Sequence, residues 1–171
     1  MEWTRIIAED LNITKNSNSN ESESDFDFND IILDVALTKT GASCILQAAG
    51  ATNMIRINGD DNLEVHKLFG VAGNVMVNTD AEKHGLNGAS KDPVEFNIGG
   101  IFSSIDKIKI EVYKNNEWIE LAAPEGDAAC KIAVGTDFEW TYERQSLKAK
   151  YPDFPKYAKD NVDIETWWKK F

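Results

Sequence analysis

The chain has 171 residues, with 29 Asp or Glu against 18 Lys or Arg, so its formal net charge is −11. This length suits one hydrophobic core, and 42% hydrophobic residues is typical of a globular composition rather than of disorder. The acidic excess argues against a nucleic-acid partner, because phosphate binding requires clustered Lys and Arg. No apolar stretch approaches the roughly 18 residues of a membrane-spanning helix, so this domain is not expected to insert into a membrane.

Short apolar segments between turn signals predict β-strands over the first three quarters of the chain. The opening ten residues predict a strand that ends in Glu9-Asp10, and residues 30–39 and 42–49 predict a hairpin with its turn at Gly41. Further strands are expected at 54–57, 63–65, 75–79, 108–113, 117–121 and 131–134. In the clearest of them, period-two alternation places Ile108, Ile110 and Val112 on one face.

Two stretches are predicted to be long polar connections. Residues 14–24 contain no apolar side chain, so they cannot offset the entropy of ordering unless an ion or a partner fixes them. Residues 80–93 are similarly rich in Asp, Gly, Asn and Ser. The two cysteines, Cys44 and Cys130, are interpreted as small buried strand residues, and a disulfide between them stays open.

The character of the sequence changes after Thr136. Good helix formers predict a helix over 141–151 that Pro152 ends, and residues 163–168 suggest further helical turns. The resulting expectation is one mostly β domain over 1–171, an antiparallel, jelly-roll-like β-sandwich on which residues 137–171 pack as a helical C-terminal extension.

The acidic run 25–30, Asp-Phe-Asp-Phe-Asn-Asp, is the sharpest chemical feature. On an extended strand Asp25, Asp27 and Asn29 would share a face at steps of about 7 Å, too far apart for one ion. The backbone must therefore curl if they are to converge, with the rings of Phe26 and Phe28 as anchors. An all-oxygen, irregular ligand set suits Ca²⁺ better than Mg²⁺, and the lack of neighbouring Cys or His argues against Zn²⁺.

The spacing of this run starts like an EF-hand loop and then departs from it. The sixth position is Asp30 instead of Gly, and the twelfth is Ala36 instead of Glu. Glu9, Asp10 and Asp34 are the candidates to complete the ligand shell. The alternative is that these acids only cap and solvate the start of a strand.

The run Asp25–Val35, preceded by Ala8–Leu11, resembles the signature of LruC-type domains, which occur in bacterial secreted and surface lipoproteins of unassigned function. The similarity extends to residues 45–50, 64–70, 76–79, 91–94, 138–140, 143–144, 149–154 and 167–168. It implies an extracytoplasmic β-sandwich within a longer precursor, and no catalytic residues. It also implies Asp25, Asp27, Asn29 and Asp30 as calcium ligands, with Glu9 and Asp10 as weaker ones.

These observations predict a non-catalytic, calcium-stabilised, secreted or cell-surface module for adhesion or protein–ligand interaction, with a surface protein or a glycan as its partner. One alternative is a carbohydrate-binding module, because five Trp and four Tyr could stack on sugars instead of packing in the core. The other is a carboxylate-dependent hydrolase. Neither His66, interpreted as a satisfied strand histidine, nor His84, interpreted as solvated, has the spacing of a catalytic or zinc site.

Overall fold

The computed structural model describes residues 1–10, 25–80, 89–122, 130–155 and 167–168, and the statements below concern these residues. The strands of the larger sheet are β1 (Thr4–Ala8), β2 (Ile31–Thr38), β3 (Gly41–Ala49), β6 (Val77–Asn78), β7 (Ala89–Ser90), β8 (Val94–Gly99) and β11 (Lys131–Gly135). Those of the smaller sheet are β4 (Ile55–Ile57), β5 (Asp60–Glu64), β9 (Ile110–Lys114) and β10 (Glu117–Glu120). The helices are α1 (Val65–Phe69), a 3-10 turn (Ile105–Lys107) and α2 (Leu147–Lys150).

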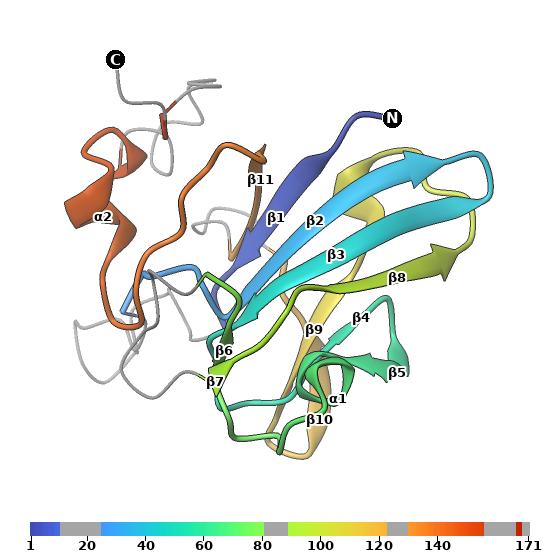
Figure 1. Cartoon of the computed structure of the whole chain (residues 1–171), viewed down its shortest axis with the longest axis horizontal. Coiled ribbons are helices and arrows are strands. Elements are labelled where there is room, and N and C mark those ends of the chain that lie inside the picture. Colours follow the sequence, from blue (N-terminus) through green and yellow to red (C-terminus); the bar gives the residue numbers. More distant parts are fainter. Residues whose placement is uncertain (11–24, 81–88, 123–129, 156–166, 169–171) are drawn as a thin grey trace.

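The described chain is mostly β and forms two sheets, as the sequence predicted (Figure 1). The larger, seven-stranded sheet has the order β11-β1-β2-β3-β6-β7, and β8 pairs with β3 beside this path. The smaller has the order β10-β9-β4-β5. Pairing is antiparallel in both sheets except between β6 and β7, which run parallel and make the larger sheet mixed.

The main hydrophobic core lies between the two sheets. It joins alternate residues of the larger sheet, such as Ile6, Leu33 and Leu46, to Ile55 and Ile110 of the smaller one. The predicted face of residues 108–112 is confirmed, since Ile108, Ile110 and Val112 are all buried. This arrangement is a sandwich, in which side chains from two inner faces interdigitate.

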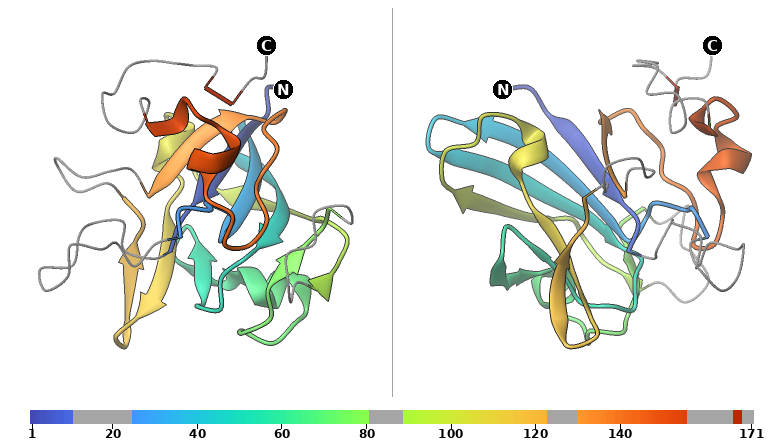
Figure 2. Two further views of the ribbon diagram at one scale, coloured as in Figure 1. Left: turned by 90° about the vertical axis from the view of Figure 1, so that its left-hand side faces the viewer. Right: turned by 180° about the vertical axis from the view of Figure 1, so that it is seen from behind.

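A second hydrophobic cluster covers part of the outer face of the larger sheet. Ile7, Ile32 and Val134 point away from the main core and pack against aromatic residues near the end of the chain, namely Phe138, Trp140, Tyr151, Phe154 and Trp167. In Figures 1 and 2 this C-terminal part lies beside β1 and β11. β2 is therefore buried on both faces, which explains its nearly continuous apolar sequence.

The predicted helix over 141–151 is wrong for most of its length. Only Leu147–Lys150 is helical, and Arg144 has a positive φ of 62° that no continuous helix allows. Elsewhere, Val65–Phe69 is a helix and not the end of a strand. Its buried residue His66 is satisfied as expected, with Nδ1 2.6 Å from Glu64 Oε1 and Nε2 3.1 Å from the Ala51 carbonyl.

One strand boundary and one whole strand also differ from expectation. The turn of the first hairpin lies at Lys39-Thr40, and Gly41 instead begins β3, where a Cβ atom would lie 2.0 Å from the Ile98 carbonyl oxygen. β8, which forms that contact, was not anticipated. Cys44 is buried in β3 and Cys130 is half-buried just before β11, and no disulfide joins them.

Four expectations lie wholly or partly outside the described residues: the polar connections over 14–24 and 80–93, the solvated His84, and the helical turns expected over 163–166. Among the helices of the described part, none is long and apolar enough to cross a membrane.

Candidate metal centre

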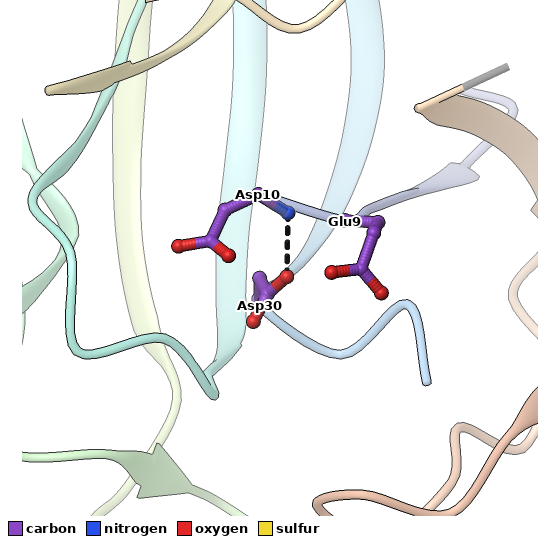
Figure 3. Close-up of side chains that lie close together, drawn as sticks. All are labelled: Glu9, Asp10 and Asp30. Carbon is purple, nitrogen blue, oxygen red and sulfur yellow. Dashed lines mark hydrogen bonds between the residues drawn. The ribbon is translucent and has the colours of Figure 1, made fainter. Parts of the chain in front are cut away.

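Antiparallel pairing of β1 with β2 brings the acidic residues to one edge of the larger sheet. Ala8, the last residue of β1, is the register partner of Ile31, the first residue of β2. Glu9 and Asp10 directly follow Ala8, and Asp30 directly precedes Ile31. Figure 3 shows Asp30 lying between the side chains of Asp10 and Glu9.

The run before β2 curls, as predicted. Phe26 and Phe28 have φ angles of 59° and 53°, in the left-handed region that bulky residues rarely adopt. Each such residue costs about 1–2 kcal/mol, so other contacts must hold it. Phe28 is buried with its ring 5.5 Å from that of Phe154, and the half-buried ring of Phe26 lies 3.6 Å from Lys148 Nζ.

The curl assembles two groups of carboxylates that share one member. Glu9, Asp10 and Asp30 form the first group, and Glu9, Asp25 and Asp27 form the second. Within each group one oxygen of each side chain lies within 4.8 Å of the others. Separations of this size allow several oxygens to contact one ion with metal–oxygen distances of about 2.4 Å. Glu9 is thus the common element of the site.

Among the described residues, the hydrogen bonds to Asp10, Asp27 and Asp30 come from neutral donors. The Asp10 N–H donates to Asp30 Oδ2 at 2.6 Å, and Asn53 Nδ2 donates to Asp10 Oδ2 at 2.8 Å. The backbone N–H of Arg144 donates to Asp27 Oδ2 at 2.8 Å. Lys114 donates to the carbonyl of Asp10, not to its carboxylate. In the described part of the chain, no ion pair with Lys, Arg or His is formed by Asp10, Asp25, Asp27, Asp30 or Glu143.

Burial with no ion-pair partner among the described residues makes the charged forms of Asp27 and Asp30 costly. Burial, followed by the charge of Asp25, raises the pKa of Asp27 from 3.8 to about 8. Burial and the charges of Asp10 and Glu9 hold the pKa of Asp30 well above its usual range. A bound cation would lower the pKa of both carboxyl groups again and so favour their ionised form.

Asn29 contributes an amide oxygen at the same place. The residue is 5% exposed, and its Nδ2 donates to the Thr141 carbonyl at 3.3 Å. Its Oδ1 is buried and accepts no hydrogen bond from the described residues. Gly50 leaves room for it, since a Cβ atom there would lie 2.2 Å from Oδ1. An amide oxygen is a common calcium ligand, so the unsatisfied acceptor fits a cation site.

Six of the seven candidate ligands named from the sequence lie at this edge, and the five carboxylates among them form the two groups. Asp34 does not join them. It pairs instead with Arg5, whose Nε and Nη2 donate to its two oxygens at 2.6 and 2.9 Å. Glu143 was missed. It lies beside the cluster, and burial and then the charge of Asp25 raise its pKa from 4.5 to about 7. No local sequence signal connects it to a motif more than a hundred residues earlier.

No family model, curated protein or solved structure matches this chain. The similarity to LruC-type domains therefore rests on the sequence motifs, and function has to be argued from the site itself.

Proposed function

We propose that this protein is a non-catalytic, Ca²⁺-stabilised module of a secreted or cell-surface protein, serving adhesion or protein–ligand interaction. The observation that supports this most is the buried acidic edge, where Glu9, Asp10, Asp27 and Asp30 are at most 6% exposed. Buried carboxylates are ordinarily paired with cations or bound to metals. Among the described residues, the hydrogen bonds to Asp10, Asp27 and Asp30 come from neutral groups, and the possible metal ligands are all oxygen atoms, which suits a hard cation.

A stabilising role fits this burial better than a catalytic one. Glu9 and Asp27 are 0% and 1% exposed, so their carboxylates do not face a substrate in solution. The groups come from the end of β1 and the start of β2, and a cation between them would fasten both strands at the sheet edge. Binding to the folded chain alone stabilises it by mass action. The weak affinity usual for extracellular calcium modules, about 10⁻⁴–10⁻³ M, suits the proposed location.

The test is thermal unfolding in chelator, in calcium and in magnesium. Calcium at about fifty times its dissociation constant should stabilise the fold by about 2 kcal/mol and raise Tm by about 5 °C, while magnesium has a smaller effect. Asp27→Asn should lose this rise, and Asp92→Asn, at an exposed position, should keep it. A Tm that calcium does not move in the unsubstituted protein would reject the proposal.

A second candidate function, carbohydrate binding, is favoured by an open hollow on the outer face of the larger sheet. The hollow has a volume of about 400 Å³ and is lined by Trp3, Ser43, Cys44, Ile45, Glu95, Phe96 and Asn97. One half-buried indole beside hydroxyl, amide and carboxylate groups is a setting in which a sugar ring could stack and form hydrogen bonds. With a single carboxylate, the hollow lacks the acid pair of a glycoside hydrolase.

The other described tryptophans are less suited to sugars. Trp140 and Trp167 are buried, and Trp167 meets Trp168 at 85°, so the two rings are not coplanar. The guanidinium of Arg56 covers Trp118 at 4.2 Å from its centroid. A neutral polysaccharide array therefore tests this second function through Trp3→Ala, with Trp118→Ala as the matched control. Binding to the array that Trp118→Ala keeps and Trp3→Ala loses would support carbohydrate binding. Absence of binding by the unsubstituted protein would reject it.

A further inference from the structure

The C-terminal segment (residues 137–155) is fastened to the acidic run by backbone and side-chain hydrogen bonds. The Thr141 hydroxyl donates to the Asp27 carbonyl at 2.7 Å, and the Leu147 N–H donates to the Phe26 carbonyl at 2.8 Å. With the Arg144 N–H on Asp27 Oδ2, these contacts tie three points of the segment to two neighbouring residues. The segment is therefore positioned by the same loop that positions the carboxylates.

Glu143 belongs to this segment and faces the acidic edge. Its Oε2 is buried and has no hydrogen-bond partner among the described residues. Burial and then the charges of Asp25, Glu9 and Asp10 raise the pKa of its carboxyl group, and the charge of Arg144 lowers it. Arg144, the next residue, has a positive φ of 62°, and its own backbone N–H donates to Asp27 Oδ2, so the chain at Glu143 adjoins the acidic edge.

Asn29 connects the acidic run to the C-terminal segment without using a carboxylate. The residue is more than nine-tenths buried. Its Nδ2 donates to the Thr141 carbonyl, and its unpartnered Oδ1 lies beside Gly50. Without a cation, Glu143 adds another negative charge to an edge that already holds five carboxylates, and this repulsion opposes docking of the segment. With a cation present, the same carboxylate is attracted.

We propose that Glu143 is a further ligand of the Ca²⁺ site, and that the bound cation thereby clamps the C-terminal segment onto the outer face of the larger sheet. The inference rests on the proposed calcium function and adds a regulated element to it. Binding and docking are then linked reciprocally, because whatever strengthens one strengthens the other. When the segment detaches, the aromatic residues of the second hydrophobic cluster no longer cover Ile7, Ile132 and Val134.

Limited proteolysis of the whole chain, together with calorimetric titration of Ca²⁺, tests this. Trypsin can cut after Arg144 and Lys148, whose side chains are exposed, but cleavage requires the surrounding backbone to leave its docked position. The informative variant is Glu143→Gln. The matched control is Glu139→Gln in the same segment, since Glu139 is largely exposed and pairs with Lys150 at 3.6 Å.

Calcium should slow cleavage at these two sites about tenfold or more in the unsubstituted protein and in Glu139→Gln. Glu143→Gln should bind calcium about tenfold more weakly or worse, and calcium at the same concentration should protect it far less. Its cation-free Tm should equal or exceed that of the unsubstituted protein, because a repelling carboxylate has been removed, and this separates lost binding from lost folding.

Two results distinguish the failures. If the unsubstituted protein binds calcium, but Glu143→Gln binds it equally well and is equally protected, the clamp is overturned while the calcium site stands. If the unsubstituted protein binds no calcium, both the clamp and the proposed function are rejected.

Discussion

Asp27 accepts a hydrogen bond at 2.8 Å from the backbone N–H of Arg144, 117 positions later in the chain. This bond connects a carboxylate of the acidic edge to the segment that covers the outer face of the larger sheet. Because Thr141 also donates to the Asp27 carbonyl, the backbone and the side chain of Asp27 both hold the same segment. The acidic run is therefore a junction between two strands and the C-terminal segment.

Glu9→Gln should weaken calcium binding more than any other single substitution at the site. Glu9 belongs to both carboxylate groups, whereas Asp25 belongs to one and is only half-buried. We expect a loss in affinity of about 100-fold for Glu9→Gln and about tenfold for Asp25→Asn. Calorimetric titration measures both, with Glu2→Gln at an exposed position as the control. Equal losses would show that Glu9 is not shared.

The stability of the cation-free protein should fall as pH rises from about 4 to about 8. The folded-state pKa values of Asp27, about 8, and Glu143, about 7, lie above their ordinary values of 3.8 and 4.5. In this interval the folded chain holds more protons than the unfolded chain, so the free energy of unfolding decreases with pH. The contribution is fully present below pH 4 and is lost above pH 8.

Thermal unfolding in chelator at a series of pH values measures this dependence. We expect Tm to decline on the order of 5 °C across the interval, and saturating calcium to remove most of the decline because it favours the ionised carboxylates. Asp27→Asn should have a flatter profile in chelator. A cation-free Tm that climbs from pH 5 to 8 would contradict the assignment of these acids.

Gly50→Ala should lower both stability and calcium affinity. The added Cβ would lie 2.2 Å from Asn29 Oδ1, so the Asn29 amide has to move. Displacing a well-packed group costs about 1–3 kcal/mol. Gly73→Ala is the matched control, because its Cβ would come no closer than 3.7 Å to Met54. Chemical denaturation and calcium titration of both variants check this, and an unchanged calcium affinity in Gly50→Ala would remove Asn29 from the ligand set.

Asp34→Asn should destabilise the fold without affecting calcium. Asp34 and Arg5 form a buried, two-contact ion pair, and Arg5 Nη1 also donates to the Phe138 carbonyl at 2.6 Å. Removing one partner of such a pair typically costs about 3–5 kcal/mol. The rise in Tm on adding calcium should stay as in the unsubstituted protein. A reduced rise would place Asp34 in the site after all.

The predictable parts of this protein are those fixed by local pattern. Alternation identified the strand β9 (Ile110–Lys114) to within two residues. The polar–aromatic alternation of the acidic run, together with the reach of one ion, required a curled loop. Antiparallel pairing of two successive strands was then enough to bring Glu9 and Asp10 to Asp30. The same alternation in Val94–Gly99 was present in the sequence but overlooked.

The parts that could not be predicted depend on tertiary contacts. Residues 141–146 contain good helix formers, yet the backbone N–H of Arg144 bonds to Asp27, so docking overrides local propensity. No ligand motif in the sequence distinguishes Glu143 from a solvent-exposed helix residue. Only the docking of its segment on the sheet does so. Asp34 was expected to be a ligand because it lies close in sequence to the acidic run. It pairs instead with Arg5, which lies 29 residues away in the chain.

The most direct test of the calcium site is isothermal titration of the metal-free protein with Ca²⁺, alongside Asp27→Asn. The unsubstituted protein should show saturable binding with a dissociation constant of about 10⁻³ M or lower, and proton release that increases at lower pH as Asp27 and Glu143 ionise. Asp27→Asn should show little or no binding. Absence of saturable binding in the unsubstituted protein, or identical binding in the two proteins, would contradict the account.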